Sequence, residues 1–291
     1  MRRKGGKRRM WMILVILAVI AAGILAFFTL PYSVTRAQFA KTVTEQMAAS
    51  PVSSASDDIF TSDDIQELPE PVRKYFEYSG YIGTPKMSYM KAAFKDVDFI
   101  MSPDKPAIRI DYTQYNFVHE PVRLAYIDTS MYGIPFEGFD SYVDGHGGMK
   151  GVLGKIIPLF HQTGEAMNRA CLVTFLSESL VMPNAALQDY ITWEAVDATH
   201  AKATITYKGI SASGIFTFSD RGQLLTFTTE DRSVISADGT VQQVAWSALF
   251  DDYKTIGGIK QPTHLQAVWN YEQGDLIYFD GSSFTIEYHP Y

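Results

Sequence analysis

Cysteine is almost absent from this sequence, since Cys171 is the only one among 291 residues. A single cysteine excludes an internal disulfide and a cysteine-rich structural zinc site. It also excludes a lipoprotein anchor, because no cysteine stands directly after the N-terminal apolar segment. A catalytic thiol needs an exposed position and a nearby base, and the sequence reveals neither. Cys171 is therefore predicted to be a small core residue.

Metal, cofactor and nucleophile motifs are also missing. The six histidines are scattered, and His119-Glu120 is followed by Pro121, which does not fit the helical zinc motif. The glycine-rich stretch 145–151 has Lys150 where a dinucleotide fingerprint needs its third glycine, and 209–214 has Ser213 where a nucleophile elbow needs glycine. The stretch 145–151 favours a hairpin turn and a bulged strand, and 209–214 also lacks the strand-to-helix context of a nucleophile elbow. We predict no catalytic set, metal site or cofactor, and the sequence favours a protein that is not an enzyme.

Positive charge is concentrated in residues 1–9, which hold six basic residues. The net charge of the whole chain is -7, so the remainder is strongly acidic, near -13. An acidic domain of this kind argues against binding to nucleic acid and against electrostatic adhesion to anionic lipid.

A long apolar run follows the basic residues. Residues 10–30 carry no charge, and as a helix they extend about 31 Å, close to the roughly 30 Å of a bilayer core. The basic flank predicts a cytoplasmic N-terminus, with Trp11 and Tyr32 at the two interfaces. We therefore expect a single-pass protein of a cell membrane whose C-terminal domain is extracytoplasmic.

A signal-peptidase site is the alternative to an uncleaved anchor. Thr35 and Ala37 are small residues at a suitable spacing for cleavage. However, the apolar run is longer than the roughly 7–15 residues of a signal peptide. The resulting division is a cytoplasmic tail (1–9), an anchor that contacts the bilayer (10–31), a juxtamembrane segment and Ser/Asp-rich linker (32–64), and an extracytoplasmic β domain (65–291).

The β domain shows a period of two from Met87 onward. Apolar and polar residues alternate in segments separated by turns such as Asp144-Gly145 and Asp238-Gly239, with no interleaved helices. This pattern predicts antiparallel strands. One short helix is expected within 68–80, with Val72, Tyr75, Phe76 and Ser79 on one face. A second helix, within 164–181, is apolar almost all round and should be buried on more than one side.

The predicted fold class is mostly β. About ten strands in one sheet tend to curl or split. We expect a large, curved antiparallel sheet, an open or half barrel, with the 164–181 helix across its concave face.

Four polar residues are candidates for a site. Asp140, Tyr142 and Asp144 share one face of a strand, where successive Cβ atoms are about 6.5–7 Å apart, so the carboxylates suit either acid–base work or a solvated strand end. Glu178 lies within the apolar helix, where a carboxylate needs a partner. It is either a structural anchor or a catalytic or ligand-orienting group.

Aromatic residues make up 13% of the chain, and many lie on strands. They either fill a core or leave an apolar pocket for a lipid-like ligand. The candidate pocket residues lie on apolar stripes or on the helix: Phe117, Phe136, Met149, Phe175 and Trp246.

The sequence resembles the bacterial family of unknown function DUF6544 over residues 66–250. The resemblance rests on motifs in a common order: Leu68-Pro69-x-Pro71-Val72-x-x-Tyr75-Phe76 with Ser79-Gly80, Tyr142-x-Asp144-Gly145-x-Gly147-x-Met149, Phe175-Leu176-x-Glu178 with Pro183, and Trp193-Glu194 with Asp197. The chain departs from the family in having Phe136–Phe139 where a Trp-containing segment is common, and Thr174-Phe175 in place of arginine-tyrosine. The resemblance implies no particular reaction or ligand. The layout is also similar to the open barrels of Lol-type lipoprotein carriers.

Three functions remain open at this point. The first is a membrane-tethered protein that binds a hydrophobic or lipid-like ligand outside the cytoplasm. The second is an envelope interaction or assembly module with no ligand. The third is a hydrolase that uses Glu178 with Asp140 or Asp144.

Overall fold

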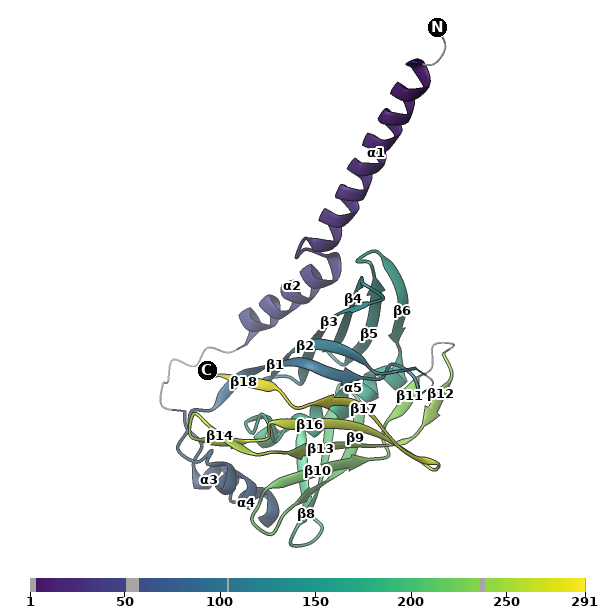
Figure 1. The fold of residues 1–291 in the computed structure, drawn as a ribbon. Coiled ribbons are helices and arrows are strands. Elements are labelled where there is room, and N and C mark those ends of the chain that lie inside the picture. Colours follow the sequence, from purple (N-terminus) through teal and green to yellow (C-terminus); the bar gives the residue numbers. More distant parts are fainter. Residues whose placement is uncertain (1–3, 51–57, 104, 236–238, 291) are drawn as a thin grey trace.

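The computed structural model describes residues 4–50, 58–103, 105–235 and 239–290. The first helix, α1 (Lys4–Thr29), projects from the rest of the molecule (Figure 1). Its large apolar side chains are exposed, except for Phe28, which is half-buried. The helix ends before Pro31, which cannot continue a helix. Within the described residues, one helical segment, 6–49, has the length and composition to cross a membrane.

The second helix, α2 (Val34–Ala49), begins at Ser33, whose hydroxyl accepts a hydrogen bond from the Arg36 backbone N–H at 3.0 Å. This is an N-cap, which satisfies one of the free N–H groups of the first turn. The helix buries Phe39 and Val43 against the outside of the sheet. Phe39 stacks on Tyr126 with ring centroids 5.5 Å apart. The segment after the apolar run is thus packed against the domain.

The prediction of a linker is wrong for residues 58–64. Residues 51–57 of it lie outside the described residues, but 58–64 are folded. Phe60 is fully buried, and Thr61 and Asp64 form a capping box that starts α3 (Ser62–Ile65). Within 58–64, Ser62, Asp63 and Asp64 contribute to the composition that indicated a linker, but they form this helix start, where such residues are also favoured.

The short helix predicted within 68–80 is confirmed as α4 (Glu70–Ser79). Val72, Tyr75, Phe76 and Ser79 are all fully buried, as their spacing indicated. Gly80 ends the helix in a left-handed conformation, φ 78°, which glycine adopts without steric cost.

The predicted antiparallel sheet is confirmed, and the described residues form 14 of its strands in one open sheet. The order is β6-β5-β4-β3-β2-β1-β17-β16-β13-β10-β9-β8-β7, with β18 also paired to β1. These strands have the following bounds: β1 (Met87–Phe99), β2 (Ile108–Phe117), β3 (Val122–Met131), β4 (Ile134–Val143), β5 (His146–Leu153), β6 (Ile157–Thr163), β7 (Ile191–Ala195), β8 (His200–Tyr207), β9 (Ile210–Phe218), β10 (Leu224–Thr229), β13 (Ala245–Asp251), β16 (His264–Tyr271), β17 (Gly274–Gly281) and β18 (Phe284–Pro290).

Two small hairpins complete the strand set: β11 (Ser233–Ile235) with β12 (Val241–Gln243), and β14 (Lys254–Ile256) with β15 (Ile259–Gln261). The glycine-rich stretch 145–151 is a hairpin turn followed by β5, as predicted. Asp144 and Gly145 have φ of 52° and 80°, which fits the turn type that matches strand twist.

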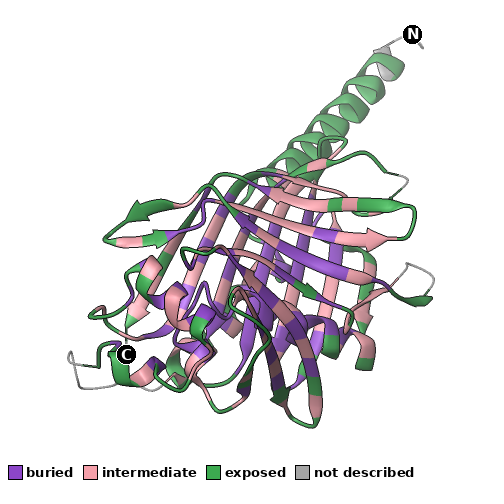
Figure 2. Cartoon of the chain, turned by 90° about the horizontal axis from the view of Figure 1, so that it is seen from below, coloured by how far each residue is buried: buried purple, intermediate pink, exposed green. Residues whose placement is uncertain are grey.

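The mid-chain helix is confirmed as α5 (Glu165–Glu178), and a short 3₁₀ turn, η1 (Ala185–Leu187), follows it. α5 connects β6 to β7, the two edges of the sheet, and packs against strands from both ends, including β5 and β9. The sheet therefore curls around α5, and the face that carries α5 is concave (Figure 2). Gly147 permits this contact, because a Cβ there would lie 2.6 Å from the Met167 carbonyl oxygen.

Among the residues that the structure describes, buried apolar side chains form three clusters. The central core surrounds α5 and α4 and includes Phe175, Leu176 and Trp246. The anchor-side cluster lies on the concave face toward the β3–β4 turn, and consists of Ala92, Phe94, Val97, Ile110, Tyr112, Ala125, Ile127 and Phe284. The outer cluster lies beneath α2 on the opposite face and consists of Phe39, Val43, Phe117, Val122, Leu124, Tyr126 and Phe139.

Candidate functional site

The register of β2, β3 and β4 brings polar residues together on the concave face. Arg123 pairs with Asn116 on β2 and with Tyr142 on β4. One step along the same face, Ala125 lies between Gln114 and Asp140. Side chains directly opposite one another on antiparallel strands point to the same side. The polar patch therefore faces α5.

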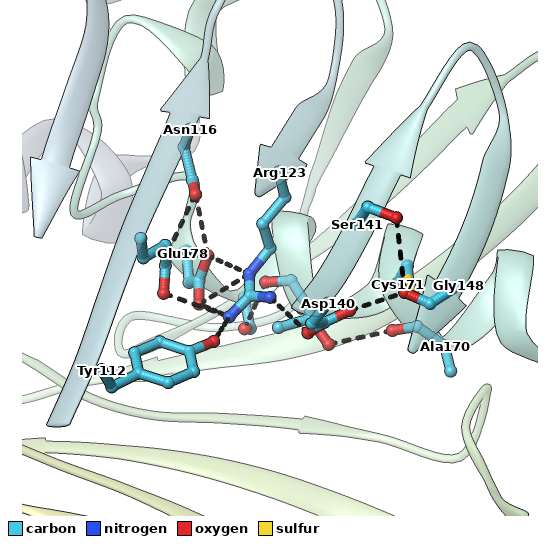
Figure 3. A network of polar contacts seen from close by, with 12 residues as sticks. Tyr112, Asn116, Arg123, Asp140, Ser141, Gly148, Ala170, Cys171 and Glu178 are labelled. Atoms are coloured by element: carbon cyan, nitrogen blue, oxygen red, sulfur yellow. Dashed lines mark hydrogen bonds and ion pairs between the residues drawn. The ribbon is translucent and has the colours of Figure 1, made fainter. Parts of the chain in front are cut away.

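Arg123 is the centre of this patch, with a side chain only 6% exposed (Figure 3). Its Nη1 lies 2.8 Å from Asp140 Oδ2, and its Nε lies 3.0 Å from Glu178 Oε2. Its Nη2 donates to the Tyr112 hydroxyl at 2.6 Å and to Gln114 Oε1 at 3.1 Å. Each guanidinium nitrogen has a partner, which is what a buried cation requires.

Glu178 is equally well bound. Its Oε2 accepts from Gln114 Nε2 and from Asn116 Nδ2, each at 2.7 Å, in addition to Arg123. A carboxylate in the last turn of a helix faces the negative end of the helix dipole. The cation and two amides from the sheet offset that repulsion, so they fix the end of α5 to β2 and β3.

The Arg123 guanidinium keeps its positive charge in this network. Burial alone would lower the pKa of Arg123, but Glu178, Tyr112 and Asp140 together hold it well above its usual value. Burial raises the pKa of the Tyr112 phenol, which stays neutral. Both carboxylates are engaged with one cation, so general acid–base catalysis by either would first require breaking an ion pair.

Cys171 lies at the edge of the network. Its Sγ is 3.7 Å from Asp140 Oδ1, and burial, followed by the charge of Asp140, raises the pKa of the thiol. A thiol that stays protonated is a poor nucleophile. The neighbouring Tyr142 is fully buried, and its hydroxyl has no hydrogen-bond partner within the described part of the chain, so it bridges no carboxylates.

The structure separates the four polar residues named from sequence. Glu178 and Asp140 meet at Arg123, whereas Asp144 lies on the β4–β5 turn, where its Oδ1 is 2.7 Å from Lys208 Nζ. Sequence reasoning missed Arg123, Gln114 and Asn116. Their signal was the alternation itself, which placed them on the apolar face of their strands.

The five apolar candidates do not lie together. Phe175 and Trp246 are in the central core, and Met149 packs against both the central core and the anchor-side cluster. Phe136 lies on the concave face beside the Phe160 ring, and both rings cover Gly151. Phe117 belongs to the outer cluster, on the other side of the sheet.

The anchor-side cluster is the part of the concave face where buried apolar side chains pack outside the central core around α5. Its border is half-buried and consists of Phe99, Ile108, Met149, Leu265, Phe279 and Ile286. The ionic network lies between this cluster and α5. The concave face is thus apolar toward the β3–β4 turn and polar in its middle.

A cavity of about 280 Å³ lies between the end of α1 and the outer side of β3 and β4. Its lining includes Phe28, Arg36, Asp128, Glu137 and Lys155. Arg36 forms an ion pair with Asp128, and Tyr126 donates to Glu137 Oε1 at 2.6 Å. The end of the apolar helix α1 thus lies close to β3 and β4 of the domain. Over the described ranges, no group of three or more His, Cys, Asp or Glu side chains is arranged to hold a metal ion.

The profile of a family of unknown function, DUF6544, matches residues 58–281, which is more than half of the chain. The chain belongs to the DUF6544 family. No curated protein matches the sequence significantly.

Solved structures that are similar to this DUF6544 chain include the following two, each at 10% identity. One is a LolA superfamily protein from Nitrosomonas europaea, with a TM-score of 0.39 over 76% of this chain and 93% of that chain. The other is described as an outer membrane lipoprotein-sorting protein domain from Vibrio parahaemolyticus, with a TM-score of 0.37 over 69% of this chain and 84% of that chain. Their descriptions match the Lol-type lipoprotein carriers, whose layout the sequence resembles. Both TM-scores are below 0.5, so the function of this DUF6544 protein is inferred from its own geometry.

Proposed function

We propose that this chain is a single-pass membrane protein whose extracytoplasmic sheet binds a hydrophobic or lipid-like ligand on its concave face. The observation that carries the proposal is the anchor-side cluster, a buried apolar cluster with a half-buried border on the concave face of the open sheet. An open sheet can admit a ligand between its curled strands without unfolding.

The anchor half of the proposal is supported by α1 and α2. Large apolar side chains are exposed along most of α1, and a soluble protein avoids an exposed apolar surface of this size. Cleavage after Ala37 would cut through α2 and separate Arg36 from Asp128. An uncleaved anchor keeps that helix and its contacts with the sheet intact.

The ligand half is supported by the side chains around the cluster. Phe99 and Ile108 pair across β1 and β2 at the open end of the concave face, and both are half-buried. Phe279 lies edge-on to Phe94 with ring centroids 5.5 Å apart. Aromatic and branched side chains of this kind give a ligand apolar contact, with no charged group of the network required.

The test uses the full-length protein in detergent. Native mass spectrometry would look for co-purified lipid, and a fluorescent fatty-acid probe would be titrated into the parent protein. We expect Phe99→Gln and Ile108→Gln each to weaken probe binding about tenfold, since each removes an apolar contact of roughly 1.5 kcal/mol or more. Val196→Gln, at an exposed turn residue, is the matched control and should bind as the parent does.

The outcome decides between two functions. Retained melting temperature with weaker binding in both variants supports ligand binding on the concave face. A parent protein that carries no lipid and binds no probe would overturn it, and would favour an envelope interaction module without ligand.

A further inference from the structure

The turns next to the anchor carry exposed apolar side chains. We define the anchor-side rim as Tyr132, Ile134, Ile156, Ile157 and Leu159, from the β3–β4 and β5–β6 hairpins. Tyr132 is completely exposed and Ile156 is 70% exposed. Exposed apolar residues are normal when single, but a group at one end of a sheet marks a contact surface.

The rim is joined to α1. Lys155, between Gly154 and Ile156, is buried, and its ammonium donates to the carbonyl oxygens of Phe27, at 2.9 Å, and Leu30. These carbonyls belong to the C-terminal end of α1, where they lack helical partners and where a cation is favourable. A Cβ on Gly154 would lie 3.5 Å from the Phe28 ring. The β5–β6 turn therefore lies beside residues 27–30.

This contact fixes the depth of the rim. Phe28 lies about 3 Å along the helix from Leu30, the last residue of the apolar run, because a helix rises about 1.5 Å per residue. If residues 10–30 span the hydrocarbon core, the β5–β6 turn reaches the boundary of that core. A Cβ on Gly154 would also lie 3.6 Å from Ile134 Cγ2. The β3–β4 turn therefore lies at a similar level to the β5–β6 turn (Figure 1).

The residue types in the β3–β4 turn and on the edge strand β6 agree with this depth. Tyr132 has φ 54°, where asparagine or glycine is usually favoured in a two-residue hairpin turn. An aromatic with a polar tip at this place suits a membrane interface. β6 is an edge strand of the sheet, and exposed edges are usually protected by charge. Here Ile157 and Leu159 are exposed instead.

We propose that the anchor-side rim inserts into the interfacial layer of the bilayer that α1 crosses, so that the anchor-side cluster opens toward the lipid leaflet. The proposal rests on the membrane tether of the proposed function. It adds an orientation of the domain and a route by which a lipid-like ligand reaches the concave face from the leaflet, without crossing bulk water.

The test is depth measurement on the full-length protein in phosphatidylcholine vesicles. Ile157→Cys and Tyr132→Cys would each carry an environment-sensitive fluorophore, with Ile20→Cys in α1 and Ile256→Cys in the distant β14–β15 hairpin as references. Lipids with a nitroxide near the headgroup would act as quenchers. The parent protein controls for the native Cys171, which is buried.

We expect blue-shifted emission and strong quenching at 132 and 157, and neither at 256. Unquenched labels at 132 and 157, with position 20 embedded, would overturn the rim proposal and leave the tether standing. A label at position 20 that reports water would overturn the tether and the rim proposal together.

Discussion

The guanidinium of Arg123 binds Glu178, with 3.0 Å between Nε and Oε2, and so joins the middle of the sheet to the last turn of α5. A buried ion pair gives little net stability relative to apolar residues, but leaving one member unpaired is costly. The network therefore specifies where α5 sits within the sheet.

Arg123→Met should destabilise the protein by about 3–5 kcal/mol, because Glu178 and Asp140 would remain buried without a cation. Chemical denaturation followed by circular dichroism measures this. Asp144→Asn is the matched control, since it breaks an exposed ion pair with Lys208 and should leave the melting temperature unchanged. Equal effects of the two changes would show that Arg123 is not the organising charge.

Leu176→Asp should abolish folding. Leu176 is fully buried within α5, and burying an unpaired carboxylate costs several kcal/mol against a total stability of about 5–15 kcal/mol. Arg169→Asp, on the exposed side of the same helix, should melt near the parent temperature. A folded Leu176→Asp protein would mean that α5 can leave its place between the two ends of the sheet.

The Cys171 thiol should resist modification in the native protein. Burial, and then the Asp140 carboxylate, raise its pKa, so both access and thiolate are lacking. A maleimide should react with Cys171 only after urea unfolds the domain. Rapid labelling in native buffer would contradict the position of Cys171 against Gly147.

Asp197 gives a pH dependence of defined sign. The Thr199 backbone N–H, and then His200, lower the pKa of Asp197 from 3.8 to about 2. A carboxylate with a lowered pKa in the folded state stabilises it above the unfolded pKa, and this contribution fades as the pH falls from about 4 toward 2. The melting temperature of Asp197→Asn should be below that of the parent at pH 7, and the gap should narrow below pH 4. A gap that is constant with pH would exclude this titration.

The membrane fraction should contain the chain with its anchor. Cleavage near Ala37 would remove Arg36 and the capped start of α2, so we expect intact mass measurement to give an uncleaved N-terminal segment. A mature protein that begins at Gln38 would show that the apolar run is a signal peptide.

Local patterns were enough to predict much of the fold. The period of two, the Asp144-Gly145 turn and the all-round apolar 164–181 helix depend on neighbouring residues, and all three appear in the structure. Phe60 shows the limit of such patterns. It stands in a polar stretch, and only tertiary contacts with Phe76 and Tyr81 bury it.

The polar network could be predicted only in part. Glu178 was identifiable because a charge stood in an apolar helix. Its partner Arg123 depends on the register of β2, β3 and β4 and on the packing of α5, which involve contacts 55 positions apart in sequence. The same dependence explains why Phe117 and Phe175, both apolar, lie on opposite sides of the sheet.

The strand order has a consequence for biosynthesis. β1 is an early strand, yet it takes its second neighbours from β17 and β18, the last strands of the chain. A growing polypeptide therefore completes β1–β6 while one edge of β1 still has free N–H and C=O groups. That edge is a ready template for pairing with another chain until residues 274–290 arrive. Loss of the last two strands would thus expose the middle of the sheet, with aggregation as the foreseeable result.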